Sequence, residues 1–140
     1  MLVYAESSAV LAWLLGEKEG ALVLACLREA KDVLSSELTV TECQRALVRL
    51  ETARLLSPGD ARSRRSILLR AARSWSMVAL TPELHERAGR PFPREPVRTL
   101  DALHLAMATC IAELHPGIRV LTLDPRIREN AEALGLTVLV

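Results

Sequence analysis

The chain begins with the stretch Met1-Leu-Val-Tyr-Ala-Glu6, an apolar run that ends in a carboxylate. The same order returns near the other end of the chain in Arg119-Val-Leu-Thr-Leu-Asp124. Neither run alternates regularly between apolar and polar residues, which is typical of strands buried on both faces of a parallel sheet. Short runs of this kind predict strands at Leu2–Ala5, Val33–Ser35, Met77–Leu80, Arg119–Leu123 and Thr137–Val140. The sequence therefore predicts a parallel sheet of roughly five strands.

Helical patterns fill the segments between these strands. They cover Ser7–Leu15, Glu19–Ala30, Glu37–Leu55, Pro58–Arg73, Pro82–Ala88, Asp101–Leu114 and Pro125–Leu134. Gly135 follows the last helix, in the position where a glycine commonly ends a helix. Alternating strands and helices predict an α/β fold, a three-layer α/β/α sandwich. The length of 140 residues fits one domain over residues 1–140.

Composition favours a cytoplasmic protein. No basic region precedes the first apolar run, which Glu6 ends, so we expect no signal peptide. No apolar stretch approaches the roughly 18 residues that span a bilayer, so we expect no membrane segment. Cys26, Cys43 and Cys110 are odd in number and widely spaced, which matches neither a disulfide framework nor a zinc motif. We expect them to be small buried side chains.

The formal net charge of +1 conceals an uneven distribution of charge. Residues 61–98 hold nine arginines and three glutamates, whereas the rest of the chain holds nine basic and fourteen acidic residues. A basic lobe beside an acidic pocket would suit a polyanionic substrate. Arginines on solvated helix faces would give the same distribution. The sequence leaves both interpretations open.

Four acidic residues end or interrupt apolar segments, where carboxylates are rare without a partner. They are Glu6, Glu42, Asp101 and Asp124. Glu6 and Asp124 end predicted strands and could simply cap the helices that follow. Helical periodicity places Glu42 and Asp101 among apolar side chains, so we expect both to point inward.

Carboxylates that converge in one pocket repel one another and raise each other's pKa. A hard cation such as Mg²⁺ or Mn²⁺ relieves this repulsion, because both ions favour oxygen ligands. Waters on such an ion supply a nucleophile, and the ion polarises a phosphoryl oxygen. The acid set therefore predicts a metal-dependent hydrolase.

Each acid lies in a short segment with a distinctive pattern. The segments are Tyr4-Ala-Glu-Ser-Ser-Ala, Ser36-Glu-Leu-Thr-Val-Thr-Glu, Arg98-Thr-Leu-Asp-Ala-Leu-His-Leu-Ala and Leu121-Thr-Leu-Asp. In this order they resemble the four acidic motifs of PIN domains, which include the free-standing VapC-type toxins of bacterial type II toxin–antitoxin pairs. The resemblance implies an endoribonuclease in which Mg²⁺ or Mn²⁺ is bound by Glu6, Glu42, Asp101 and Asp124. It also implies a homodimer, an RNA substrate and, for a toxin, a small antitoxin protein that blocks the site.

One position departs from the family pattern, whose first acid is typically Asp. The additional methylene of Glu6 displaces the carboxylate by about 1.5 Å, whereas catalytic groups are held to within about 0.5 Å. Two hypotheses remain: a working nuclease, and a catalytically weakened PIN-like domain with a binding or regulatory role.

Four further residues could support the site. Ser8 and Thr122 each lie two residues from a strand-end acid and could orient ligands or waters. Arg98 precedes the third motif and could hold a phosphate. His104 lies three residues after Asp101 and could hydrogen-bond that carboxylate or a phosphate, or it could pack in the core.

Overall fold

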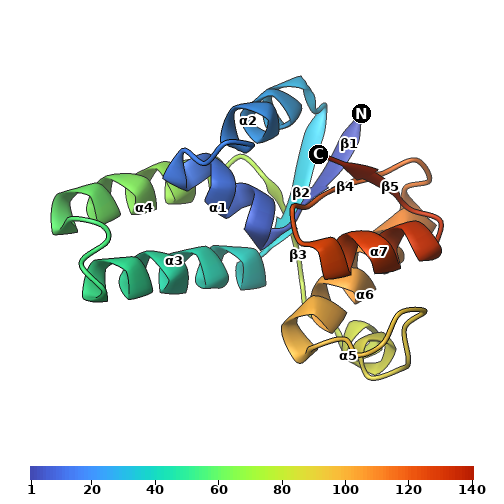
Figure 1. Ribbon diagram of the computed structural model, residues 1–140. Helices are drawn as coiled ribbons and strands as arrows, with labels where there is room; N and C mark the ends of the chain where they lie inside the picture. Colours follow the sequence, from blue (N-terminus) through green and yellow to red (C-terminus); the bar gives the residue numbers. More distant parts are fainter.

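The computed structural model describes every residue from Met1 to Val140. Its strands are β1 (Leu2–Ala5), β2 (Asp32–Ser36), β3 (Ser76–Val78), β4 (Arg119–Leu121) and β5 (Thr137–Leu139). Its helices are α1 (Ser7–Leu15), α2 (Gly20–Glu29), α3 (Glu37–Thr52), α4 (Pro58–Ala72), α5 (Pro82–Ala88), α6 (Thr99–Leu114) and α7 (Pro125–Ala133). The sheet lies between two groups of helices (Figure 1).

The five strands form one sheet in the order β3-β2-β1-β4-β5, and every neighbouring pair is parallel. The predicted α/β/α sandwich with its parallel sheet is confirmed. The chain builds outward from β1 to β2 and β3, and then returns to the other side of β1 for β4 and β5. Ligands of such sheets bind outside the carboxyl ends of the strands, at the point where the order reverses. That point lies between β1 and β4.

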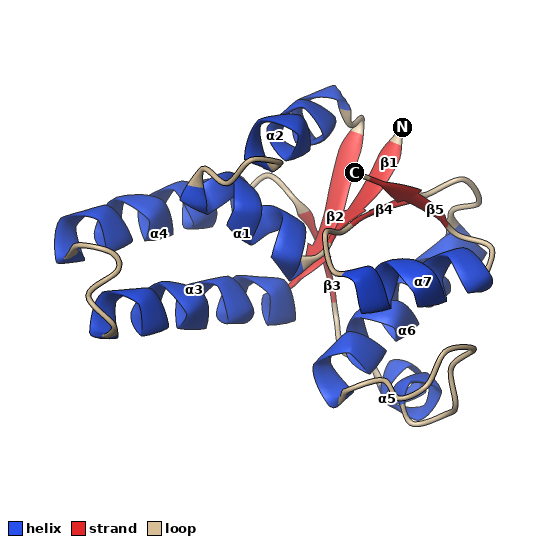
Figure 2. Cartoon of the chain, in the orientation of Figure 1, coloured by secondary structure: helices blue, strands red, loops and turns tan.

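The central strand contributes to both layers of the core. Val3 and Ala5 pack with side chains of α1 to α4, whereas Tyr4 packs with α5 and α6. Figure 2 shows the helices of these two groups on either side of the strands. Because both faces of the sheet are covered, buried side chains follow one another without a polar residue between them. This explains why β1 shows no alternation in the sequence.

The predicted bounds differ from the observed ones mainly at element ends. The helix predicted to reach Leu55 ends at Thr52, because the chain turns away with Arg54 at a φ of 57°. The strand predicted through Leu123 ends at Leu121, the last residue of β4 that pairs with its neighbours. Gly135 follows α7 with a φ of 81°, the left-handed conformation predicted from the sequence.

The arginine-rich segment does not form one basic lobe. Its first five arginines lie on or next to α4, and the others lie on α5 and in the loop before α6. These two regions lie at opposite sides of the molecule in Figure 1. Three of the arginines form ion pairs: Arg87 with Glu113 at 2.7 Å, Arg90 with Glu86, and Arg98 with Asp101 at 3.6 Å. The interpretation as solvated helix faces is therefore the better one.

The cysteines fit their prediction in part. Cys43 is buried, whereas Cys26 and Cys110 are partly exposed, and all three are free thiols. Burial raises the pKa of the Cys43 thiol, with smaller contributions from the charges of Glu42 and Glu6. None of the helices has the length and apolar character needed to cross a membrane.

Gly20 lies where α2 packs closely against α1, and its substitution tests that contact. A Cβ atom at this position would lie 2.5 Å from the backbone oxygen of Ala12. Gly20→Ala should therefore lower the free energy of unfolding by about 1–3 kcal/mol, measured by urea denaturation. Gly59→Ala in α4 is the control, since its Cβ would meet only the Ser57 hydroxyl at 4.0 Å. Equal losses of stability in both variants would show that the close packing of Gly20 against Ala12 does not exclude a larger side chain.

Candidate functional site

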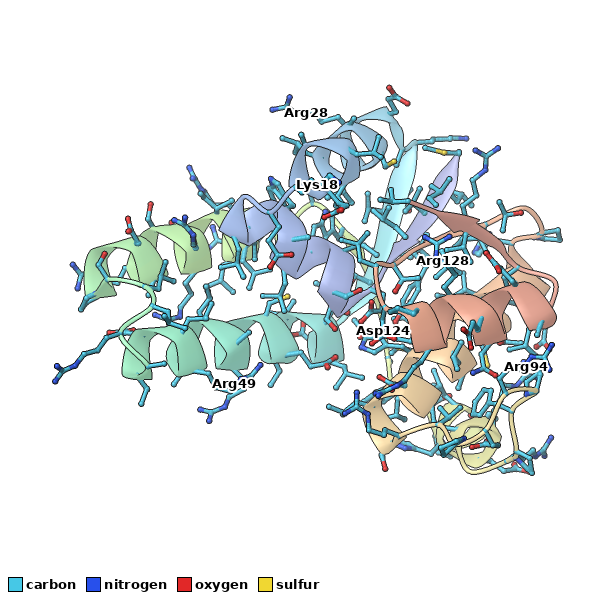
Figure 3. The ribbon with its side chains drawn as sticks, viewed as in Figure 1. Lys18, Arg28, Arg49, Arg94, Asp124 and Arg128 are labelled. Atoms are coloured by element: carbon cyan, nitrogen blue, oxygen red, sulfur yellow. The ribbon has the colours of Figure 1, made fainter.

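The four acids selected from the sequence line one cleft at the carboxyl ends of β1 and β4. The cleft has a volume of about 460 Å³, and its wall includes Glu6, Ser7, Ser8, Leu11, Glu42, Arg98, Thr99, Leu100, Asp101 and Asp124. Asp124 lies at the N-terminal end of α7, between the two groups of helices (Figure 3). The cleft thus occupies the point where the strand order reverses.

Glu6 is the most buried of the four acids, with 3% of the residue exposed. Its Oε1 accepts hydrogen bonds from the Ser7 hydroxyl at 2.6 Å and from the Ser8 backbone N–H at 3.1 Å. Its Oε2 accepts from the Ser8 hydroxyl and from the Thr122 hydroxyl, the latter at 2.8 Å. A carboxylate has about four lone-pair sites. Protein donors therefore saturate the Glu6 carboxylate.

Ser8 and Thr122 each link Glu6 to the segment after β4. The Ser8 hydroxyl donates to Glu6 and accepts the Leu123 backbone N–H at 2.9 Å. The Thr122 hydroxyl donates to Glu6 and accepts the Asp124 backbone N–H at 3.1 Å. These two side chains orient a carboxylate of the cleft and the loop that carries another.

Asp124 and Asp101 retain free carboxylate oxygens. Asp124 caps α7 with Oδ1 alone, which accepts the backbone N–H groups of Arg126 at 2.8 Å and Ile127 at 3.3 Å. Asp101 Oδ2 is buried and has no hydrogen-bond partner. Arg98 Nε lies 3.6 Å from that oxygen, on a side chain that is 72% exposed.

The surroundings of Asp101 oppose its ionisation. Burial is the largest cause that raises the pKa of the Asp101 carboxyl, and the negative charge of Asp124 adds to it. Arg98 lowers that pKa, and Glu6 raises it slightly further. Carboxyls in a cleft whose pKa is shifted by burial and by a neighbouring charge are typical of functional sites.

The buried side chain of His104 holds the Glu42 carboxylate in place by a hydrogen bond. The imidazole Nε2 lies 2.5 Å from Glu42 Oε1, and Nδ1 lies 2.7 Å from the Tyr4 hydroxyl. Burial raises the pKa of Tyr4, so its hydroxyl keeps its proton. Because a carboxylate oxygen only accepts hydrogen bonds, Nε2 carries the proton that is donated to Glu42, and in the neutral imidazole Nδ1 then accepts from the Tyr4 hydroxyl. His104 is buried, and the carboxylate that it binds is Glu42 rather than Asp101.

Some carboxylate oxygens of the cleft accept no hydrogen bond from the protein. They fit a hard cation that keeps several waters better than one that protein ligands enclose fully. No three acidic, histidine or cysteine side chains lie close enough together to hold an ion alone. Mg²⁺ commonly takes only one or two protein carboxylates and keeps several waters. Asp101 and Asp124 could supply direct ligands, and Glu42 Oε2, which accepts no hydrogen bond, could bind a water of the ion. The orphaned Asp101 oxygen is the feature that such an ion would satisfy.

Asp101→Asn tests the electrostatic cost of the cleft in metal-free buffer. A carboxyl whose pKa is raised by folding stabilises the fold least when it is ionised, so stability falls as pH rises through the folded-state pKa. Asp101→Asn should therefore raise the free energy of unfolding at pH 7. The gain should shrink as the pH falls through the folded-state pKa, and it should be lost below about 4, the pKa of an unfolded Asp. Chemical denaturation at several pH values measures both effects.

The control for this measurement is Glu129→Gln, which removes a negative charge from the exposed face of α7. It should leave the free energy of unfolding nearly unchanged. If Asp101→Asn were less stable than the natural protein at pH 7, the claim that burial and the charge of Asp124 oppose the ionised Asp101 carboxylate would be contradicted.

Tyr4→Phe tests the chain of hydrogen bonds that runs from Tyr4 through His104 to Glu42. Removal of the hydroxyl leaves the ring in place but deprives buried Nδ1 of its partner, at a cost of about 1–3 kcal/mol. Because Tyr4 reaches Glu42 only through His104, Tyr4→Phe and Glu42→Gln should couple by at least about 0.5 kcal/mol in a double-mutant cycle. Additive losses in urea denaturation would show that the three side chains do not act as a unit.

Comparison with known proteins shows the family to which the chain belongs. The sequence model of the PIN domain family matches residues 3–133 of this chain. Ribonuclease VapC46 of Mycobacterium tuberculosis (strain ATCC 25618 / H37Rv) is 32% identical over 137 residues, which cover 98% of this chain and 95% of the relative. Ribonuclease VapC35 of Mycobacterium tuberculosis (strain CDC 1551 / Oshkosh) is 30% identical over 139 residues, again 98% of this chain and 95% of the relative. The chain belongs to the PIN domain family.

Proposed function

We propose that the protein is a metal-dependent endoribonuclease, which hydrolyses phosphodiester bonds of RNA. The observation that carries this proposal is the convergence of four acids in one cleft, with a buried oxygen of Asp101 left without a partner. The relatives are named ribonucleases, which supports RNA as the substrate.

Each acid has a different role in this proposal. Asp101 and Asp124 hold Mg²⁺ or Mn²⁺ through their free oxygens, and Glu42 orients water through Oε2 while His104 fixes Oε1. When bound, the ion polarises the phosphoryl oxygen and increases the acidity of the attacking water. Arg98 at the margin of the cleft binds a phosphate oxygen of the substrate.

Glu6 acts from outside the set of direct ligands. Its four hydrogen bonds leave no oxygen free for an ion. We assign it the task of holding the loop that carries Asp124, together with Ser8 and Thr122. The longer side chain thus replaces the typical Asp of the family with a buried anchor.

The relatives support a proposal for the biological setting. Their VapC names support a role as the toxin of a bacterial toxin–antitoxin pair. In that role the protein acts in the cytoplasm as a homodimer, and a small antitoxin protein covers the cleft. Sedimentation of the purified protein tests the dimer independently of activity.

Asp101→Asn tests the proposed reaction. Cleavage of RNA with Mg²⁺ or Mn²⁺ should fall by at least about 100-fold, since the variant loses charge where the transition state needs it. Mn²⁺ should also stabilise the natural protein and so raise its melting temperature. At a free Mn²⁺ concentration of 100 times Kd, the free energy of unfolding should rise by about 2.7 kcal/mol. That rise should be absent in Asp101→Asn and retained in Glu129→Gln. Equal cleavage by Asp101→Asn and the natural protein would contradict the proposal.

The second candidate function is a weakened PIN-like domain that binds or regulates without cleaving. The saturation of Glu6 is the observation that favours it. The same cleavage assay separates the two candidates when Glu6→Asp is included. Activity in Glu6→Asp that the natural protein lacks would support the weakened domain, and robust cleavage by the natural protein would exclude it.

A further inference from the structure

A second groove opens from the acid cleft and follows α3. It has a volume of about 400 Å³ and shares Ser7, Leu11, Glu42 and Leu100 with the cleft. Because these four residues belong to both hollows, a ligand bound in the cleft can continue into the groove. The groove extends along α3 as far as Arg45 and Arg49.

The groove carries two positive charges that the fold does not use. Arg45 and Arg49 are both exposed, and neither takes part in an ion pair. They lie one helical turn apart, about 6 Å along the axis of α3. Arg49 extends from the side of α3 that faces away from α4 (Figure 3). Two free guanidinium groups beside an acidic cleft are suited to the phosphates of a bound strand.

The groove also has an apolar wall. Leu11 and Leu38 are partly buried there, and Leu100 is 46% exposed although it lies beside the acids. No aromatic side chain lines the groove. A base can pack its flat face against these leucines only if it is not paired in a helix, as in single-stranded segments.

We propose that this groove binds a single-stranded segment of RNA next to the scissile phosphate. Backbone phosphates contact Arg45 and Arg49, and an unpaired base packs on Leu38 and Leu100. The assignment rests on the proposed function, since it takes the acid cleft as the place of cleavage. An acidic peptide would meet the arginines as well, but continuity with a phosphodiester-cleaving cleft favours RNA.

Binding in a cleavage-inactive protein provides the test. The probe is a fluorescently labelled single-stranded RNA of random sequence, and its anisotropy is measured with Asp101→Asn protein at several salt concentrations. Addition of Arg45→Ala or Arg49→Ala should each weaken binding about tenfold, the effect of a lost charged hydrogen bond. Each should also reduce the slope of log K against log salt by about 0.7, the value for one phosphate on a single strand. A duplex RNA should bind more weakly than the single strand.

Arg28→Ala is the matched control, because it removes an exposed positive charge from α2, outside the groove. It should leave affinity and salt slope unchanged. Equal losses from Arg28→Ala, an unchanged slope in the Arg45 and Arg49 variants, or no RNA binding would overturn the groove assignment. An unchanged affinity would leave the groove to a peptide partner. If the arginine effects are found while the natural protein fails to cleave RNA, the groove binds single-stranded RNA as assigned, but cleavage in the adjoining cleft, and with it the proposed function, fails.

Discussion

The hydrogen bonds to the Glu6 carboxylate are the interactions on which the rest of the site depends. Hydrogen bonds to an ionised group are stronger than those between neutral groups. Here they join the start of α1 to the segment after β4, two parts of the chain that are 116 residues apart at the Thr122 contact. Since Thr122 also binds the backbone N–H of Asp124, the placement of that second acid follows from the first. The anchor thus fixes the floor of the cleft at the point where the strand order reverses.

The four acids, alike in the sequence, divide by what their oxygens bind. Glu6 is saturated, Asp124 caps a helix with one oxygen, and Glu42 is fixed by a buried imidazole. Asp101 alone has a buried oxygen without a partner, in surroundings that raise its pKa. A buried group left unsatisfied costs stability, and folds retain such groups where function requires them. Asp101 is therefore the residue at which the proposed function and the stability of the fold oppose each other.

The sequence predicts the fold well because its signals are local. Apolar runs without alternation identify the strands, and Gly135 marks the end of α7. The helical period also indicates that Glu42 and Asp101 point inward. What it does not predict depends on contacts between distant segments. The pairing of His104 with Glu42 spans 62 residues, and the saturation of Glu6 depends on Thr122 after a different strand. Likewise, only the path of the chain separates the arginines of α4 from those near α5.

The central claim is that Asp101 and Asp124 hold the metal ion while Glu6 organises the cleft without binding it directly. Anomalous diffraction from crystals of the natural protein soaked in Mn²⁺ tests this most directly. We predict an Mn²⁺ peak within bonding distance of Asp101 and Asp124, with Glu6 still bound by the hydroxyls of Ser8 and Thr122. A direct bond between Mn²⁺ and a Glu6 oxygen, with those hydroxyls displaced, would contradict the account.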